Sequence, residues 1–125
     1  MPFAPILQAE SWDAAFDLPR AGIEAATREM VLALPTRPAF AQAAAAAVHV
    51  DGTARPQVVE KARDPWLHGV LAAFTAKTGC PALVNTSFNR HREPIVNRAE
   101  EALASGRQVG LAAVVVGAEI MLLDQ

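Results

Sequence analysis

The chain has 125 residues and a formal net charge of −2 at pH 7, with 52% hydrophobic and 19% charged residues. This composition is typical of a folded domain and excludes a disordered chain. The charge balance excludes a global basic field for nucleic acid, and the single cysteine, Cys80, excludes an internal disulfide framework and a cysteine-rich zinc site. We therefore expect one domain over residues 1–125.

No targeting or membrane-spanning segment is visible in the sequence. Met1–Gln8 lacks the basic start and long apolar run of a signal peptide. The longest apolar stretches, Ala43–Val48 and Leu111–Val116, are too short to cross a bilayer. The three histidines have no metal-ligand spacing. We expect a cytoplasmic protein that binds no membrane, nucleic acid or structural metal.

The first third of the chain mixes extended and helical signals. Pro5-Ile6-Leu7 is predicted to enter the edge of a sheet, because the nearby prolines hold the chain extended. Ser11 is a typical N-cap for a short helix over Trp12–Asp17. Gly22–Leu34 has helical spacing, whereas its last part, Met30–Leu34, is also compatible with a buried strand.

The middle of the chain has clearer signals for where its elements begin and end. Ala39–Val48 favours a helix by propensity, with a strand-like end at Val48-His49-Val50. Asp64 is an N-cap candidate for a helix over Pro65–Lys77, which Gly79 ends. A short buried strand is predicted at residues 82–84, and a polar loop at residues 85–91 follows it.

The last third predicts one more helix and two strands. Asn97 with Glu100 reads as a capping box for a helix over Arg98–Ala104, and Gly106 is predicted to stop it. Residues 109–116 and 118–123 read as two strands that turn near Gly117. The mixed order of elements predicts an α/β, or α+β, domain with a mixed sheet flanked by helices.

The first stretch that invites a functional interpretation is His49-Val50-Asp51-Gly52-Thr53-Ala54-Arg55. The guanidinium of Arg55 suits bidentate binding of a phosphate or carboxylate. The backbone amides of the Asp51-Gly52-Thr53 turn are able to cradle an anion. The alternative is an ordinary turn in which Asp51 bonds its own backbone.

The second stretch is Asn85-Thr86-Ser87-Phe88-Asn89, followed by Arg90, His91 and Arg92. Its amides and hydroxyls come at the carboxyl end of a predicted strand, where α/β sheets place ligands. They suit an oxygen-rich ligand such as a phosphate or carbamoyl group. The alternative is a turn that satisfies its own hydrogen bonds.

Neither stretch holds a recognisable nucleophile system. Ser87 is not flanked by a Gly-x-Ser-x-Gly elbow. Cys80 is expected to be a small buried apolar residue, and His68 a surface or partly buried ring on a helix.

Together, four segments resemble the C-terminal domain of NodU/CmcH-type O-carbamoyltransferases. They are His49–Gln57, Thr78-Gly79-Cys80-Pro81, Asn85–Asn89 and Glu93-Pro94-Ile95-Val96, and Pro2-Phe3-Ala4-Pro5 resembles the start of that domain's core. The resemblance covers nearly the whole chain. It also favours a strand over a helix at Met30–Leu34.

The resemblance implies a YrdC-like α/β fold with a twisted mixed sheet. In that family the domain follows a larger ASKHA-type domain and uses carbamoyl phosphate and ATP to make a carbamoyl-adenylate, and the larger domain transfers the carbamoyl group to an acceptor hydroxyl. ATP with Mg is then a substrate, and no tightly bound cofactor is expected. The role implied for this chain lies in secondary-metabolite biosynthesis.

Carried over by position, the resemblance assigns eight residues to one site. The catalytic residues are Ser87, Asn89 and Arg55, and the substrate- or nucleotide-binding residues are Thr53, Asn85, Thr86, His49 and Arg92. Both polar stretches are expected to converge on a single cavity that holds a charged, oxygen-bearing ligand.

The departures from the family pattern suggest a need for a partner. The family's Lys-x-Arg element precedes its Pro-Phe-Ala-Pro segment, and this chain begins at Met1-Pro2-Phe3. Arg92 stands where the family has a glycine. We therefore expect a separate ASKHA-type chain as partner, and a homodimer that covers an apolar edge near Phe3, Ile6 and Leu7. Two alternatives stay open: a binding or regulatory module that has lost turnover, and different chemistry on another small acid or phosphate.

Overall fold

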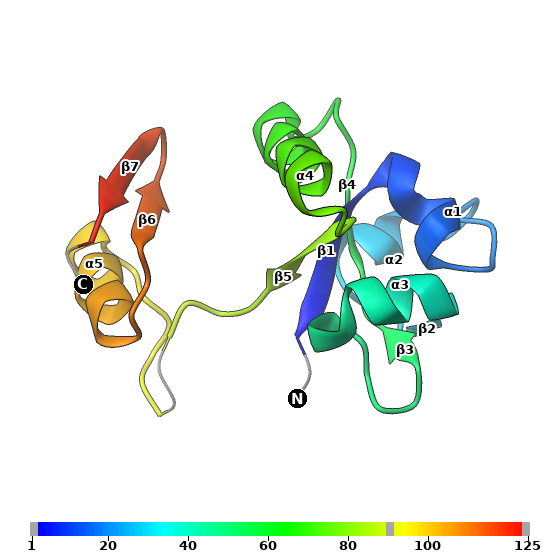
Figure 1. Cartoon of the computed structure of the whole chain (residues 1–125), viewed down its shortest axis with the longest axis horizontal. Coiled ribbons are helices and arrows are strands. Elements are labelled where there is room, and N and C mark those ends of the chain that lie inside the picture. Colours follow the sequence, from blue (N-terminus) through cyan, green and yellow to red (C-terminus); the bar gives the residue numbers. More distant parts are fainter. Residues whose placement is uncertain (1–2, 90–91, 124–125) are drawn as a thin grey trace. The chain divides into compact units, whose positions relative to one another are not determined.

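The structure is a computed structural model that describes residues 3–89 and 92–123. It divides into two compact units, Met1–Thr86 and Ser87–Gln125 (Figure 1). The model contains helices and strands with a mixed sheet, as the sequence predicts for an α/β fold.

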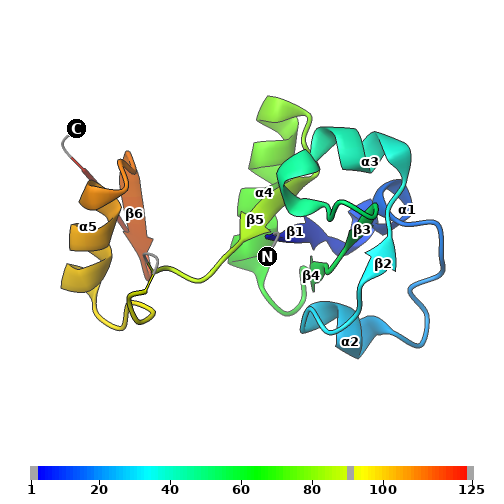
Figure 2. The same cartoon turned by 90° about the horizontal axis from the view of Figure 1, so that it is seen from below.

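The main sheet of the first unit has three strands in the order β4-β1-β5, with β1 at Ala4–Gln8, β4 at Gln57–Val59 and β5 at Ala82–Asn85 (Figures 1 and 2). β4 runs parallel to β1 and β5 runs antiparallel to it. β1 is therefore the central strand, and the prediction that Pro5–Leu7 forms a sheet edge is wrong. Leu7 is fully buried.

A second, two-stranded sheet pairs β2 at Leu34–Pro35 with β3 at Thr53–Ala54. The strand expected over Met30–Leu34 is wrong for all but its last residue, because Met30 lies in a turn and residues 31–33 form no regular structure. Met30 has a φ of 54°, in the left-handed region that interrupts a strand. Of the region Gly22–Leu34, which has helical spacing, only Glu24–Arg28 forms a helix, α2.

Four further short helices contribute to the first unit, and some of their side chains lie in its core. They are η1 at Ala9–Ser11, α1 at Trp12–Ala15, α3 at Pro38–Ala43 and η2 at Ala45–Ala47. The ring centroids of Trp12 and Phe16 lie 4.5 Å apart, and those of Phe16 and Phe40 lie 5.9 Å apart. These three aromatic side chains pack together in the core of the unit. Ser11 occupies the cap position of α1, but its side chain makes no capping hydrogen bond.

Helix α4, Pro65–Thr78, forms as its sequence signals predict. Asp64 Oδ1 accepts from the backbone N–H of Leu67 at 2.9 Å, and Pro65 takes the first helical position. Gly79 ends the helix in the left-handed conformation, with a φ of 74°. Leu71 on this helix is fully buried.

The second unit packs helix α5, Ala99–Gln108, against a hairpin of β6 at Ala113–Val116 and β7 at Glu119–Leu122. The predicted turn at Gly117 is confirmed, with a φ of 61°. The predicted stop at Gly106 is wrong, because α5 continues through this residue. A Cβ at Gly106 would lie 2.8 Å from Leu123 Cδ1 and 2.9 Å from Val114 Cγ2, so close packing requires the glycine.

The start of α5 also differs from the prediction in detail. Arg98 holds the cap position, and Glu101 reaches back instead of Glu100. Glu101 Oε2 accepts from the backbone N–H groups of Asn97 at 2.9 Å and Arg98 at 3.3 Å. The acidic first turn thus stabilises the helix, as a capping box does, but one residue later than expected.

Candidate functional site

The turn at His49–Thr53 is held by the carboxylate of Asp51. Asp51 Oδ1 accepts from the backbone N–H of Thr53 at 2.9 Å and from its hydroxyl at 2.7 Å. These bonds lower the pKa of Asp51 below its usual value, with the Thr53 hydroxyl as the largest cause. The backbone closes through Gly52, whose N–H donates to the His49 carbonyl at 2.9 Å. The structure thus shows the ordinary turn, in which Asp51 bonds the backbone of the turn itself. The prediction of a strand-like end at Val48-His49-Val50 is wrong, because strand β3 begins only at Thr53.

The same turn fixes the ring of His49. Its Nδ1 lies 3.0 Å from Thr53 Oγ1. Because the single hydroxyl proton of Thr53 points to Asp51, Nδ1 of His49 is the donor in this contact. The other ring nitrogen, Nε2, is buried and has no hydrogen-bond partner in the described part of the chain. Thr53 Oγ1 and Nδ1 of His49, which were predicted to face a ligand, are thus engaged with each other, whereas Nε2 of His49 is not.

Arg55 differs from its neighbours in this turn. It follows β3, is half-buried, and has no hydrogen bond or ion pair with any described residue. This guanidinium follows a turn held by hydrogen bonds, and none of its N–H donors bonds to a described residue, so it is suited to bind an oxyanion. Of the first polar stretch, Arg55 is the residue best placed to act on a ligand.

Asn85 ends strand β5 and faces the other strands of the sheet. Its Nδ2 donates to Gln57 Oε1 at 2.6 Å and lies 3.3 Å from Met30 Sδ. Gln57 begins β4, so this amide pair joins both outer strands across β1. Gln57 was not predicted as a partner of Asn85, because no sequence motif marks it. The side chain of the next residue, Thr86, is exposed.

The loop at the start of the second unit is closed by hydrogen bonds between its own residues. Asn89 donates its backbone N–H to the Ser87 carbonyl at 3.1 Å and its side-chain Nδ2 to the Glu93 carbonyl at 3.0 Å. The Val96 N–H donates to the Phe88 carbonyl at 2.9 Å, which closes the loop. Ser87 is exposed. Asn89 therefore shapes this loop, whatever else it binds.

Arg92 adopts a backbone conformation that is rare for an arginine. Its φ is 69°, in the left-handed region, and its side chain is exposed. The glycine that the family pattern has at this position fits such a backbone without strain. Arg90 and His91, which the sequence analysis grouped with Arg92, lie outside the described residues.

The eight predicted site residues are divided between the two units. His49, Thr53, Arg55, Asn85 and Thr86 belong to the first unit, and Ser87, Asn89 and Arg92 belong to the second. Their convergence on one cavity stays a prediction.

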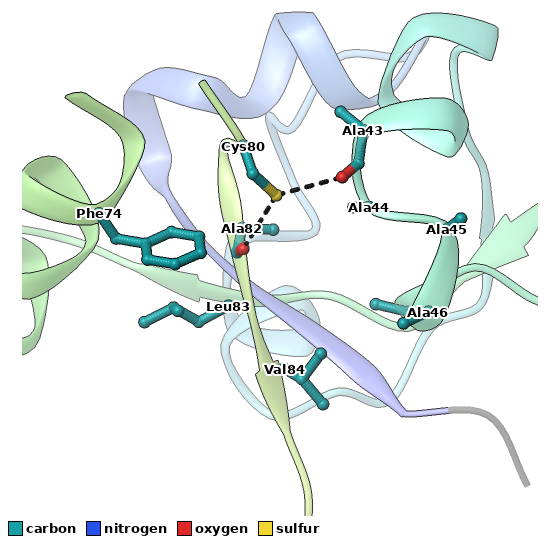
Figure 3. Close-up of a pocket in the computed structure, with 10 residues that line it drawn as sticks. Ala43, Ala44, Ala45, Ala46, Phe74, Cys80, Ala82, Leu83 and Val84 are labelled. Atoms are coloured by element: carbon teal, nitrogen blue, oxygen red, sulfur yellow. Dashed lines mark hydrogen bonds between the residues drawn. The ribbon is translucent and has the colours of Figure 1, made fainter. Parts of the chain in front are cut away.

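A cavity of about 360 Å³ opens at strand β5, and its lining is apolar (Figure 3). Phe74 of α4 lies on one side of the strand, and the alanine segment 43–47 lies on the other. Cys80 lies at one end, with Sγ 3.3 Å from the carbonyl oxygens of Ala43 and Ala82. Cys80 was expected to be buried, whereas the structure leaves it half-buried beside this cavity. Among the described residues, no charged side chain lines the cavity, so this lining does not suit a phosphate.

Comparison with known families decides what this domain is. Residues 1–122 match the family model described as the carbamoyltransferase C-terminus. The chain belongs to this family. The match includes both polar stretches and all eight predicted site residues, so the resemblance inferred from the motifs is confirmed.

Curated relatives of this carbamoyltransferase C-terminal domain are much longer proteins. It is 36% identical over 120 residues to the nodulation protein NolNO of Sinorhizobium fredii, covering 96% of this chain and 17% of that protein. It is 37% identical over 119 residues to the nodulation protein NolO of Bradyrhizobium diazoefficiens, covering 93% and 21%. It is 39% identical over 72 residues to a 3'-hydroxymethylcephem-O-carbamoyltransferase of Amycolatopsis lactamdurans, covering 58% and 14%. The chain thus spans about a fifth or less of these relatives.

Two features are absent from the described residues of this carbamoyltransferase C-terminal domain. Among residues 3–89 and 92–123, no helix is both long and apolar enough to cross a membrane. In the same ranges, no three histidine, cysteine or acidic side chains are grouped as metal ligands would be.

Proposed function

We propose that this domain binds carbamoyl phosphate and ATP, the latter as its Mg complex, and contributes to forming a carbamoyl-adenylate in an O-carbamoyltransferase of secondary metabolism. The observation that carries the proposal is the family match over residues 1–122. The relative from Amycolatopsis lactamdurans, a 3'-hydroxymethylcephem-O-carbamoyltransferase, supports the proposal. The YrdC-like fold, the nucleotide site and the cytoplasmic location are part of this proposal.

Within the first unit, Arg55 is the residue to which we assign phosphate binding. Its guanidinium is free of partners among the described residues, and the Asp51–Thr53 hydrogen bonds hold the turn that presents it. Adenylation depends mainly on positioning and on neutralising phosphate charge, so a guanidinium presented by a turn of fixed shape is well suited to it. Ser87 and Asn89 are assigned to the same chemistry by the family pattern.

We further propose that turnover requires an ASKHA-type partner chain. The chain spans 17% of one relative and 21% of another, so those proteins carry the domain together with a far longer polypeptide. The homodimer expected from the sequence also stays a proposal. The apolar edge expected near Phe3, Ile6 and Leu7 is no longer its cause, because β1 is the central strand and the edge strands of the main sheet are β4 and β5. Size-exclusion chromatography with light scattering measures the mass.

The direct test is isothermal titration of the chain with ATP and with carbamoyl phosphate. We expect saturable binding of at least one, weakened about tenfold or more in Arg55→Met, because a charge-assisted contact is lost. The matched control is Arg107→Met, which removes an exposed arginine from α5 and leaves binding unchanged. If neither ligand gives a binding signal in the titration, with or without a candidate ASKHA-type chain, the proposal is ruled out.

A second assay separates an enzyme component from a binding module. For a carbamoyl-adenylate to form, water first releases inorganic phosphate from carbamoyl phosphate, and an oxygen of the resulting carbamate then displaces pyrophosphate from the α-phosphorus of ATP. We expect pyrophosphate release only with the partner chain present, and its loss in Ser87→Ala. Ligand binding without any pyrophosphate release favours the alternative, a regulatory module that keeps the site.

A further inference from the structure

A cluster of arginines surrounds Glu60, outside the residues considered so far. Arg20 Nη2 lies 2.6 Å from Glu60 Oε1, and Arg28 Nη1 lies 3.3 Å from the same oxygen. Arg63 Nε lies 3.2 Å from Oε2. These four residues, the Glu60 cluster, come from the loop before α2, from α2, and from the segment after β4. The sequence shows no motif here.

The Glu60 cluster has an excess of positive charge. Guanidinium groups stay protonated at all ordinary pH values, so three positive charges share one carboxylate. The chain as a whole has a net charge of −2. One arginine would neutralise Glu60, and each further arginine is repelled by the others. Among the ion pairs of the described residues, the cluster thus has three guanidinium groups for one carboxylate, and a second anion would bring this ratio closer to balance.

Two of the arginines are already held in place. The side chains of Arg20 and Arg28 are 15% and 24% exposed, whereas Arg63 is 65% exposed. Arg20 Nε also donates to Thr27 Oγ1 at 3.3 Å. Because these groups are partly ordered before any ligand arrives, binding costs less side-chain entropy. The planar guanidinium groups keep other N–H donors for a ligand with several oxygens.

The position of the cluster in the sheet also suits a ligand. β1 and β4 are parallel, and their last paired residues are Gln8 and Val59. Glu60 follows directly, so the cluster lies at the carboxyl ends of both strands, where α/β proteins commonly bind ligands. Asn85 pairs with Ala4 at the opposite end of β1. Within this unit, the cluster is thus separate from the Asn85 end of the sheet.

We propose that the Glu60 cluster is a binding site for a phosphate group, either free or as a monoester. Arg28 and Arg63 donate to the phosphate oxygens, Arg20 fixes Glu60, and Glu60 keeps the guanidinium groups together while no ligand is bound. Removal of the Glu60 charge then strengthens phosphate binding. If the arginines served only to hold Glu60, its removal would create no affinity.

The test is a titration of the chain with inorganic phosphate and with glycerol phosphate, followed by NMR signals of the arginine Nε–H groups. We expect saturable shifts of Arg20, Arg28 and Arg63 with at least one of the two ligands, which also tells the free ion from the monoester. Sodium chloride at equal ionic strength gives no saturable shift. Absence of saturation with both phosphates, or equal shifts with chloride, overturns the proposal.

Three variants complete the test. Arg63→Met removes the most exposed member, so the fold is kept, and we expect at least about a tenfold loss of affinity. Glu60→Gln is expected to tighten binding, because an amide still accepts from Arg20 without repelling the ligand. The matched control is Arg37→Met, which breaks the one-to-one pair with Asp17 at 2.7 Å and leaves phosphate binding unchanged.

Several results would contradict the assignment. Unchanged affinity in Arg63→Met, or weaker binding in folded Glu60→Gln, overturns it. An equal loss in Arg37→Met also overturns it, since this would show a response to net charge alone. Arg55→Met separates this site from the proposed nucleotide site: the shifts at the Glu60 cluster persist in that variant.

Discussion

The hydroxyl of Thr53 donates to Oδ1 of Asp51 at 2.7 Å. The same oxygen also accepts from the Thr53 backbone N–H at 2.9 Å. The pair makes the turn before Arg55 a rigid element, because two donors of one residue bind one carboxylate oxygen. The turn does not need a ligand to hold its shape, and this distinguishes it from a loop that folds on binding.

The first prediction concerns the pKa of Asp51. We expect Thr53→Val to raise it toward the usual value while leaving it somewhat low, because the valine keeps only the backbone donor. A lowered carboxyl pKa stabilises the fold above the unfolded-state pKa, and this contribution disappears as the pH falls through the folded-state pKa. Thr53→Val should therefore lose stability at neutral pH and show a smaller further loss in acid. Carboxyl-carbon NMR against pH measures the pKa, and an unchanged value would contradict the hydrogen-bond cause.

The second prediction concerns the close packing at Gly106. Gly106→Ala should destabilise the second unit by about 1–3 kcal/mol, because its Cβ would meet Leu123 and Val114 below 3.0 Å. The matched control is Gly69→Ala in α4, where a Cβ meets nothing within 4 Å. That change should stabilise its helix by up to about 1 kcal/mol, since alanine is the better helix former. Chemical denaturation followed by amide NMR signals of each helix reads both effects, and equal effects of the two variants would contradict the packing argument.

The third prediction concerns the bond between Asn85 and Gln57. Asn85→Ala should lower the free energy of unfolding by about 1 kcal/mol, because it leaves the half-buried Gln57 without its 2.6 Å donor. Gln57→Met should have a similar cost. If the bond is the main role of Asn85, both variants keep ATP affinity. A loss of affinity in Asn85→Ala alone would show that Asn85 also contacts the ligand, as the family pattern implies.

Elements whose signals are local could be predicted from the sequence. Helix α4 has Asp64, Pro65 and Gly79 at its boundaries, and each acts on its own neighbours. The hairpin of the second unit turns at Gly117, where a positive φ requires little more than a glycine. The family was also recognisable, because its motifs are continuous in sequence.

Features that depend on distant residues could not be predicted. The central place of β1 results from pairing with Gln57–Val59 and Ala82–Asn85, more than forty residues away. Gly106 has the usual sequence signal of a helix end, yet its packing against Leu123 and Val114 keeps it inside α5. The Glu60 cluster joins residues from three segments, so no spacing along the chain marks it.

The fourth prediction separates strain from charge at Arg92. Arg92→Gly should raise the free energy of unfolding by about 0.5–1 kcal/mol, because glycine adopts a φ of 69° without a Cβ clash. Arg92→Ala removes the same guanidinium but keeps the Cβ, so it should leave stability unchanged within about 0.5 kcal/mol. Denaturant unfolding of the two variants measures the difference. Equal stability would show that the left-handed backbone at this position carries no strain. Since both variants lack the guanidinium, an equal loss of ATP affinity in both would assign Arg92 to the ligand, whereas unchanged affinity in both would remove it from the site.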